Sequence, residues 1–203
     1  MNKHIIETNA FLKKKITAYY SGDYHPGNRR TVTGTIENTI CTLKNDITPY
    51  SNIVLQNAVK QLENILLKDL PTILSNVKLD KLTVCVVPRA KVKYNSNQLL
   101  FKTTIKNVVN QLDNFDDATD YIIRHTDTRT THRDRAGFGG NGKMPYPGIT
   151  TDTCNISTDV ASKDILLIDD LYTKSIDINE DAIQCLLDNG ANSVYLYTIG
   201  RTI

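Results

Sequence analysis

The hydrophobic pattern changes period at about residue 80. Before that point, apolar residues recur at helical spacing over residues 3–20, 36–43 and 50–70. Residues 21–30 are interrupted by glycine and proline and predict a loop, and Pro71 is expected to end or bend the third helix. The pattern therefore predicts a mostly helical N-terminal region over residues 1–79.

After residue 80, short apolar runs alternate with amphipathic stretches. The pattern predicts, in order, a strand over 82–87, a helix over 97–112, a short strand over 121–123, a strand over 165–168, a helix over 178–188 that ends near Gly190, and a strand over 194–199. The runs at 82–87 and 165–168 are continuously apolar, as is typical of strands buried on both faces. This order predicts an α/β fold whose parallel-sheet core occupies residues 80–203.

Residues 124–158 show almost no apolar periodicity and are rich in glycine and proline after Ala136. We expect a long flexible loop there. Long loops inside compact domains are usually functional lids or disordered segments.

Composition narrows the class of protein. The chain has 203 residues, of which 40% are hydrophobic and 23% charged, as in an ordinary globular protein. A net charge of +2 gives no reason to expect nucleic acid as a direct ligand. Neither a signal peptide nor an apolar run of about 18 residues is present, so we expect a cytoplasmic protein that does not enter a membrane. The four cysteines lack CxxC spacing, and Cys85 and Cys185 are expected to be buried and reduced.

Residues 165–177 carry the strongest chemical signal. A buried strand is followed by Asp169 and Asp170, then by the polar run 173–177, and then by a predicted helix. Ligands of α/β sheets bind beyond the carboxyl ends of the strands, and backbone N–H groups at a helix N-terminus attract phosphate. The two carboxylates can accept hydrogen bonds from ribose hydroxyls or hold Mg²⁺ through water.

This segment resembles the signature of the type I phosphoribosyltransferases, which is four apolar residues, two acids, two apolar residues and then Thr-Thr-Gly-any-Thr. The apolar run, both acids, the next two residues and Thr173 match it. Lys174, Ser175 and Asp177 depart from it, and Asp177 brings negative charge to the place of a 5′-phosphate. Asp177 and Glu180 also have the spacing of a helix-capping pair, which favours a structural role for this loop.

The resemblance continues upstream. The sequence Val-Val-Pro-Arg at 86–89, followed by Asn-Gln at 97–98, is similar to the competence-associated branch of the family. Together the two segments place the resemblance over roughly residues 80–202, with nothing specific to residues 1–79.

The resemblance implies a set of roles for individual residues. It implies that Asp169 and Asp170 hold the ribose hydroxyls and, through water, Mg²⁺. It implies that the 5′-phosphate and the pyrophosphate are bound by two loops, formed by Thr173, Lys174, Ser175, Ile176 and Asp177 and by Arg89, Ala90 and Lys91 respectively. It further implies a basic lid carrying Arg129, His132, Arg133 and Arg135.

Three functions remain open at this point. The first is transfer of the phosphoribosyl group from phosphoribosyl pyrophosphate, with Mg²⁺, to a nitrogen nucleophile such as a nucleobase. The second is a catalytically inactive regulator or effector that senses a nucleotide or phosphoribosyl compound, and the third is a hydrolase. The resemblance also implies a homodimer, and the helices of residues 1–79 are a candidate base-binding hood or protein-partner surface.

Overall fold

We describe the protein from a computed structural model, which describes residues 1–47, 49–130 and 148–203. The strands are β1 (Asn2–Ile6), β2 (Ile16–Tyr24), β3 (Leu82–Val86), β4 (Phe115–Asp117), β5 (Ile122–Arg124), β6 (Cys154–Ile156), β7 (Asp164–Tyr172) and β8 (Ser193–Thr202). The α-helices are α1 (Ile36–Lys44), α2 (Asn52–Val77), α3 (Leu100–Val109) and α5 (Ile178–Asp188). Short 3-10 helices lie at Asn28–Thr31, Ser96–Gln98 and Thr158–Val160.

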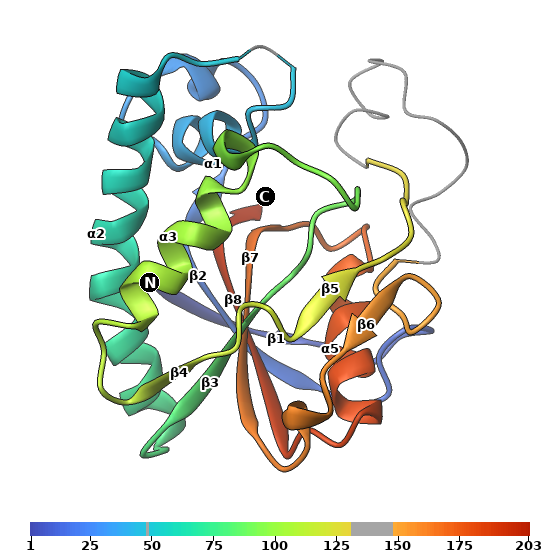
Figure 1. Cartoon of the computed structure of the whole chain (residues 1–203). Coiled ribbons are helices and arrows are strands. Elements are labelled where there is room, and N and C mark those ends of the chain that lie inside the picture. Colours follow the sequence, from blue (N-terminus) through green and yellow to red (C-terminus); the bar gives the residue numbers. More distant parts are fainter. Residues whose placement is uncertain (48, 131–147) are drawn as a thin grey trace.

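A six-stranded sheet with the order β1-β2-β8-β7-β3-β4 forms the centre of the molecule (Figure 1). Neighbouring strands from β2 to β4 run parallel, and only the edge strand β1 is antiparallel. The expected α/β class and largely parallel sheet are therefore confirmed. Because parallel strands share a direction, the carboxyl ends of β2, β8, β7 and β3 lie along one edge of the sheet.

The two faces of the sheet are covered differently. Helices α1, α2 and α3 cover one face, where Leu62, Leu66 and Ile105 pack against strand residues such as Leu166. Helix α5 covers the other face together with the small antiparallel β5–β6 sheet. The central strands β3 and β7 are thus buried on both sides, which explains their continuous apolar runs.

The helix predicted over residues 3–20 is wrong, because β1 and β2 occupy this range as an antiparallel pair. The expected loop over 21–30 is wrong in its first part, since β2 continues to Tyr24. Successive β2 residues such as Ala18 and Tyr19 are both buried, one in each core, so the period of two is hidden. The N-terminal region is therefore only partly helical, and its strand β2 joins the same sheet as β8.

Helices α1 and α5 confirm the prediction. Of the two outcomes expected at Pro71, an end or a bend of the helix, the end is wrong. Pro71 lies inside α2, which continues to Val77 and is followed by Lys78 in the left-handed conformation. Proline removes one backbone donor from a helix, but Leu70 and Ile73 on either side are fully buried. Packing against the sheet holds the helix together across the missing hydrogen bond.

The region 124–158 is less irregular than expected where the structure describes it. Cys154–Ile156 pairs with Ile122–Arg124, and Thr158–Val160 forms a helical turn. Residues 131–147 lie outside the described part of the chain. Within the described ranges, no helix has both the length and the apolar character needed to cross a membrane.

Candidate functional site

Asp169 and Asp170 lie near the carboxyl end of the central strand β7. The strand is longer than expected, since its pairing with β8 continues past both acids to Tyr172. The two carboxylates are therefore held by the sheet itself, near the carboxyl end of the strand. A rigid strand fixes their positions better than a loop does.

Asp169 is tightly bound by its neighbours. Its Oδ1 accepts a hydrogen bond from the backbone N–H of Asp170 (2.8 Å), and its Oδ2 accepts one from Asn179 Nδ2 in α5 (2.8 Å). Burial, followed by the adjacent Asp170 carboxylate, raises the pKa of Asp169 to about 7. This carboxyl group can therefore gain or lose a proton near neutral pH.

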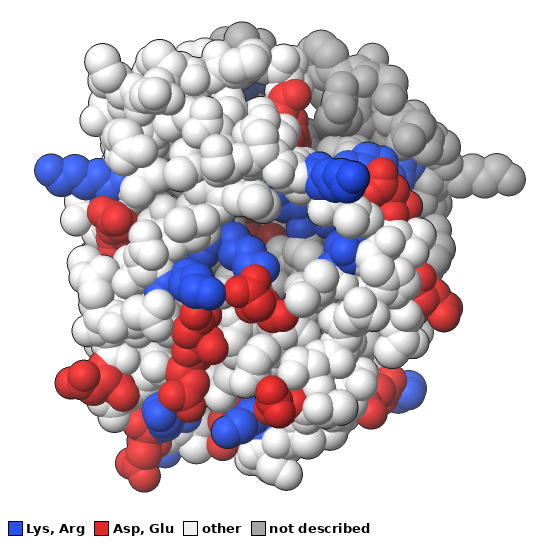
Figure 2. Space-filling model, viewed as in Figure 1, with Lys and Arg blue, Asp and Glu red and all other residues white. Residues whose placement is uncertain are grey.

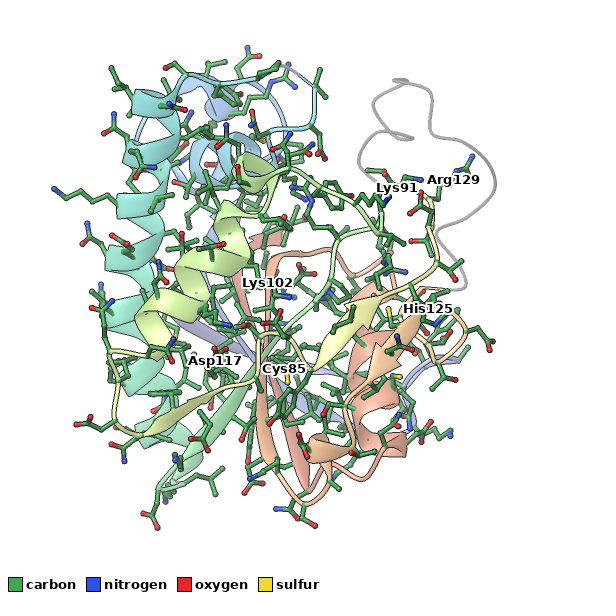
Figure 3. All side chains as sticks on the ribbon, viewed as in Figure 1. Cys85, Lys91, Lys102, Asp117, His125 and Arg129 are labelled. Carbon is green, nitrogen blue, oxygen red and sulfur yellow. The ribbon has the colours of Figure 1, made fainter. Side chains whose placement is uncertain are left out.

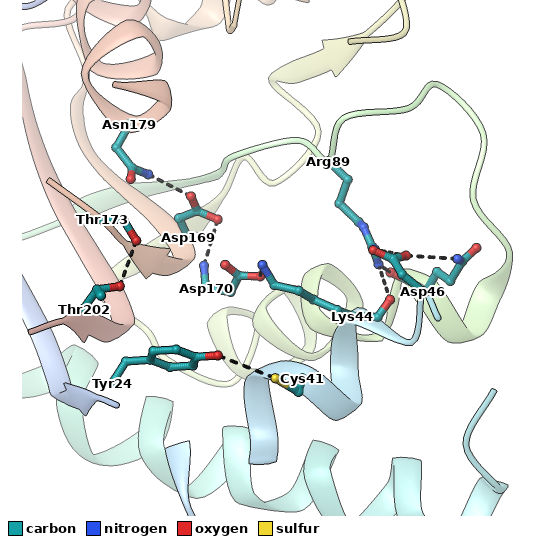
Figure 4. A network of polar contacts seen from close by, with 11 residues as sticks. Tyr24, Cys41, Lys44, Asp46, Arg89, Asp169, Asp170, Thr173, Asn179 and Thr202 are labelled. Carbon is teal, nitrogen blue, oxygen red and sulfur yellow. Dashed lines mark hydrogen bonds and ion pairs between the residues drawn. The ribbon is translucent and has the colours of Figure 1, made fainter. Parts of the chain in front are cut away.

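Asp170 forms an ion pair with Lys44, the last residue of α1 (Nζ–Oδ2 2.8 Å; Figure 4). Only about a quarter of either side chain is exposed, at 26% for Lys44 and 22% for Asp170. Burial opposes the charge on Lys44, but Asp170 outweighs it and raises the pKa of the lysine. No sequence pattern indicates this contact, which brings the N-terminal region directly to the acid pair.

The β7–α5 loop (residues 173–177) forms a side-chain hydrogen bond to the rest of the protein at each end. Thr173 Oγ1 forms a hydrogen bond with Thr202 Oγ1 (2.8 Å), and Asp177 Oδ1 accepts one from Asn9 Nδ2 (2.9 Å). Lys174 and Ser175 are exposed, and Ile176 N–H closes a turn onto the Thr173 carbonyl (2.9 Å). The loop is thus a compact turn leading into α5, as a phosphate-binding loop requires.

The expected side-chain cap of α5 is wrong. Asp177 occupies the N-cap position but makes no side-chain capping hydrogen bond, because its carboxylate faces Asn9. Glu180 does not reach back to it either. Glu180 Oε1 instead accepts a hydrogen bond from the Tyr172 hydroxyl (2.9 Å).

Two buried acids lie in the first turn of α5. Glu180 is only 1% exposed, and its Oε2 is buried without a hydrogen-bond partner among the described residues. The same is true of Asp181 Oδ2. Burial raises the pKa of Glu180 to about 7, and burial together with Asp177 raises that of Asp181 to about 6. The helix start below the loop is therefore rich in carboxyl groups that resist ionisation.

The β3–α3 loop (residues 87–95) carries the predicted pyrophosphate residues. Arg89 pairs with Asp46 and donates hydrogen bonds to the carbonyls of Lys44 (2.9 Å) and Gln98 (2.6 Å). Its guanidinium also lies over the Tyr94 ring, 4.2 Å from the centroid. Arg89 thus joins this loop to the end of α1, and its charge is engaged within the protein.

The same loop is bound to the segment that follows β5. The Ala90 carbonyl accepts the Thr128 N–H (2.8 Å), and Lys91 Nζ donates to the Thr128 carbonyl (2.8 Å). Arg129 follows directly and is partly buried, close to Lys91 (Figure 3). The other predicted lid residues, His132, Arg133 and Arg135, lie outside the described residues.

Metal binding would rely on few protein ligands. Within the described ranges, no group of three or more His, Cys, Asp or Glu side chains is placed to hold a metal ion. The adjacent Asp169 and Asp170 carboxylates can still hold a hydrated Mg²⁺ whose other ligands come from a phosphate compound and from water.

Sequence comparison adds no family assignment. No protein-family model matches this chain, and no curated protein matches it. The resemblance to the phosphoribosyltransferases therefore rests on the chain's own residues and on their placement in an α/β fold.

Proposed function

We propose that the chain is a phosphoribosyltransferase-like protein that binds phosphoribosyl pyrophosphate and Mg²⁺ at the carboxyl edge of its sheet. The observation that carries the proposal is the position of Asp169 and Asp170 at the end of β7, followed by a compact turn into α5. A second loop, with Arg89 and Lys91, follows the neighbouring strand β3. Acids for ribose hydroxyls and cations for pyrophosphate thus come from adjacent strands.

In the proposed reaction a nitrogen of the acceptor, such as a nucleobase, forms a bond to the anomeric carbon. The bond from that carbon to pyrophosphate breaks, pyrophosphate leaves with the electron pair, and the acceptor nitrogen loses its proton to solvent. Bound Mg²⁺ supplies neutralisation of the pyrophosphate charge. The protein's own contribution is positioning and charge stabilisation, with Asp170 and Asp169 orienting the ribose.

A second candidate is a sensor of phosphoribosyl compounds without transfer activity. It is favoured by the ion pair between Lys44 and Asp170 and by the negative Asp177 in the loop where a 5′-phosphate would lie. A ligand that binds Asp170 must displace Lys44 from it. Such a displacement can signal that the ligand is bound, as a sensor requires, and it does not depend on catalysis.

Pyrophosphate release separates the two candidates. The native protein is incubated with phosphoribosyl pyrophosphate, Mg²⁺ and a panel of nucleobases, with Asp170→Asn as the inactive reference. Release that depends on one base and is lost in the variant supports the transferase. Saturable binding of phosphoribosyl pyrophosphate without release for any base supports the sensor, and no binding at all contradicts both.

A further inference from the structure

A separate pocket lies beside the β3–α3 loop, on the side of β5. Its volume is about 220 Å³, and Figure 2 shows both basic and acidic side chains near the centre of the face, where the pocket lies. Its walls come from the loop after β3, the first turn of α3 and strand β5, and Asp169 and Asp170 do not line it. The pocket is therefore distinct from the acid pair.

Apolar side chains form most of the pocket wall. They include Val87, Val92, Leu99, Phe101, Ile122 and Ile123. Val92, Leu99 and Ile123 are 46%, 38% and 52% exposed, so several exposed apolar residues gather at this pocket. A small apolar body would bury this surface, and the volume suits a single ring or a short branched chain better than a larger ligand.

Arg124 is the unusual charged group of the pocket. It is only 6% exposed, its Nε donates to the Arg89 carbonyl, and its Nη1 donates to the Gly148 carbonyl (3.3 Å). No carboxylate of the described residues forms an ion pair with it. Burial lowers the pKa of the guanidinium, and the nearby Cys154, Tyr94 and Asp127 oppose this shift only in part.

The other cations of the pocket have partners within the protein. Arg89 is paired with Asp46, and Lys102 with Asp120 at 2.6 Å. Lys91 donates to the Thr128 carbonyl. Arg124, by contrast, forms no ion pair with any described residue, and it lies beside a largely apolar wall that also carries Asp120.

We propose that this pocket binds a small organic carboxylate with an apolar body, and that Arg124 binds the carboxylate. A carboxylate meets a guanidinium through charge-assisted hydrogen bonds, and an apolar body covers the exposed Leu99 and Ile123.

Benzoate is the probe that tests this proposal, with benzamide and acetate as matched compounds that lack the charge or the ring. We expect saturable binding of benzoate to the native protein by calorimetry, and at least tenfold weaker binding of the other two. Absence of saturable benzoate binding, or equal binding of benzamide, would overturn the proposal.

Variants then locate the site. Arg124→Gln is expected to weaken benzoate binding at least tenfold. Arg201→Gln on β8, which removes a guanidinium that lies over the Tyr20 ring of β2, is expected to leave benzoate binding unchanged. Since Arg124 is buried and its loss could unfold the chain, Leu99→Trp provides a second test by filling the pocket from its rim. Unchanged affinity in Leu99→Trp, or in a folded Arg124→Gln variant, contradicts the assignment.

One further arm separates this pocket from the acid pair. Benzoate binding is expected to persist in Asp170→Asn, because Asp170 does not line the pocket. Loss of benzoate binding in this variant would overturn the inference, whatever the outcome for phosphoribosyl transfer.

Discussion

The loops that follow β3 and β7 lie side by side at the same edge of the sheet, yet they use their charges differently. In the β3–α3 loop, Arg89 is engaged by Asp46, by two carbonyls and by the Tyr94 ring. In the β7–α5 loop, Thr173 and Asp177 are fastened by single hydrogen bonds, and Lys174 and Ser175 are exposed. Arg89 is thus held by several groups within the protein, whereas the Lys174 side chain in the second loop is exposed.

The end of α1 connects the two loops. Lys44 pairs with Asp170 through its side chain and accepts a hydrogen bond from Arg89 through its carbonyl (Figure 4). A ligand that displaces Lys44 from Asp170 therefore acts on the same helix end that holds the other loop. Substitutions made in each loop separately test whether the roles of the two loops differ in this way.

The largest expected effect is on stability, from Arg89→Ala. The Asp46 side chain is only 7% exposed, so removing its guanidinium partner leaves a buried charge and costs about 3 kcal/mol of unfolding free energy. Urea denaturation measures the loss, and Arg89→Lys, which keeps the charge without the planar fork, should lose less. A cost under about 1 kcal/mol would mean that Arg89 is free for a ligand instead.

The next effect concerns Glu180, in the first turn of α5 below the β7–α5 loop. Because burial raises its pKa from 4.5 to about 7, the folded state holds this proton more tightly than the unfolded state. Its contribution to stability therefore falls as the pH rises from about 4.5 to about 7, by at most about 3 kcal/mol.

Glu180→Gln, which can still accept the Tyr172 hydrogen bond, removes this dependence. The free energy of unfolding is measured for both proteins at pH 4 and pH 8. Relative to the native protein, the variant should be more stable at pH 8 than at pH 4. Parallel pH profiles for the two proteins would contradict the raised pKa.

The sequence predicts the parts of this edge that depend on local burial. The runs at 82–87 and 165–168 are apolar because β3 and β7 are covered on both faces, so the strands and the two acids were found from the pattern alone. Helix α5 was found because its apolar residues face one core only.

Other parts depend on contacts between distant segments and left no local signal. Lys44 reads as an ordinary residue at a helix end, and only the packing of α1 against the sheet edge brings it to Asp170. In the sequence Arg89 has no recognisable partner, and only the folded structure brings Asp46 to it. Arg124 lies in a short strand whose burial depends on the β5–β6 pairing.

The smallest effect is expected from Asp177→Thr. Removing its negative charge should tighten binding of ribose 5-phosphate several-fold, since the Asp177 carboxylate repels a negatively charged phosphate bound at this loop. Asn9→Ala is the matched control, because it removes the hydrogen bond to Asp177 and keeps the charge. If both variants change the affinity equally, Asp177 acts only as a tether for the loop.

The most direct test of the central claim is a calorimetric titration with phosphoribosyl pyrophosphate and Mg²⁺. The native protein should bind saturably, Asp170→Asn should bind at least tenfold more weakly, and Asp23→Asn, at an exposed carboxylate near the end of β2, should bind like the native protein. Absence of binding to the native protein, or equal binding by Asp170→Asn, would contradict the assignment of this edge as a phosphoribosyl site.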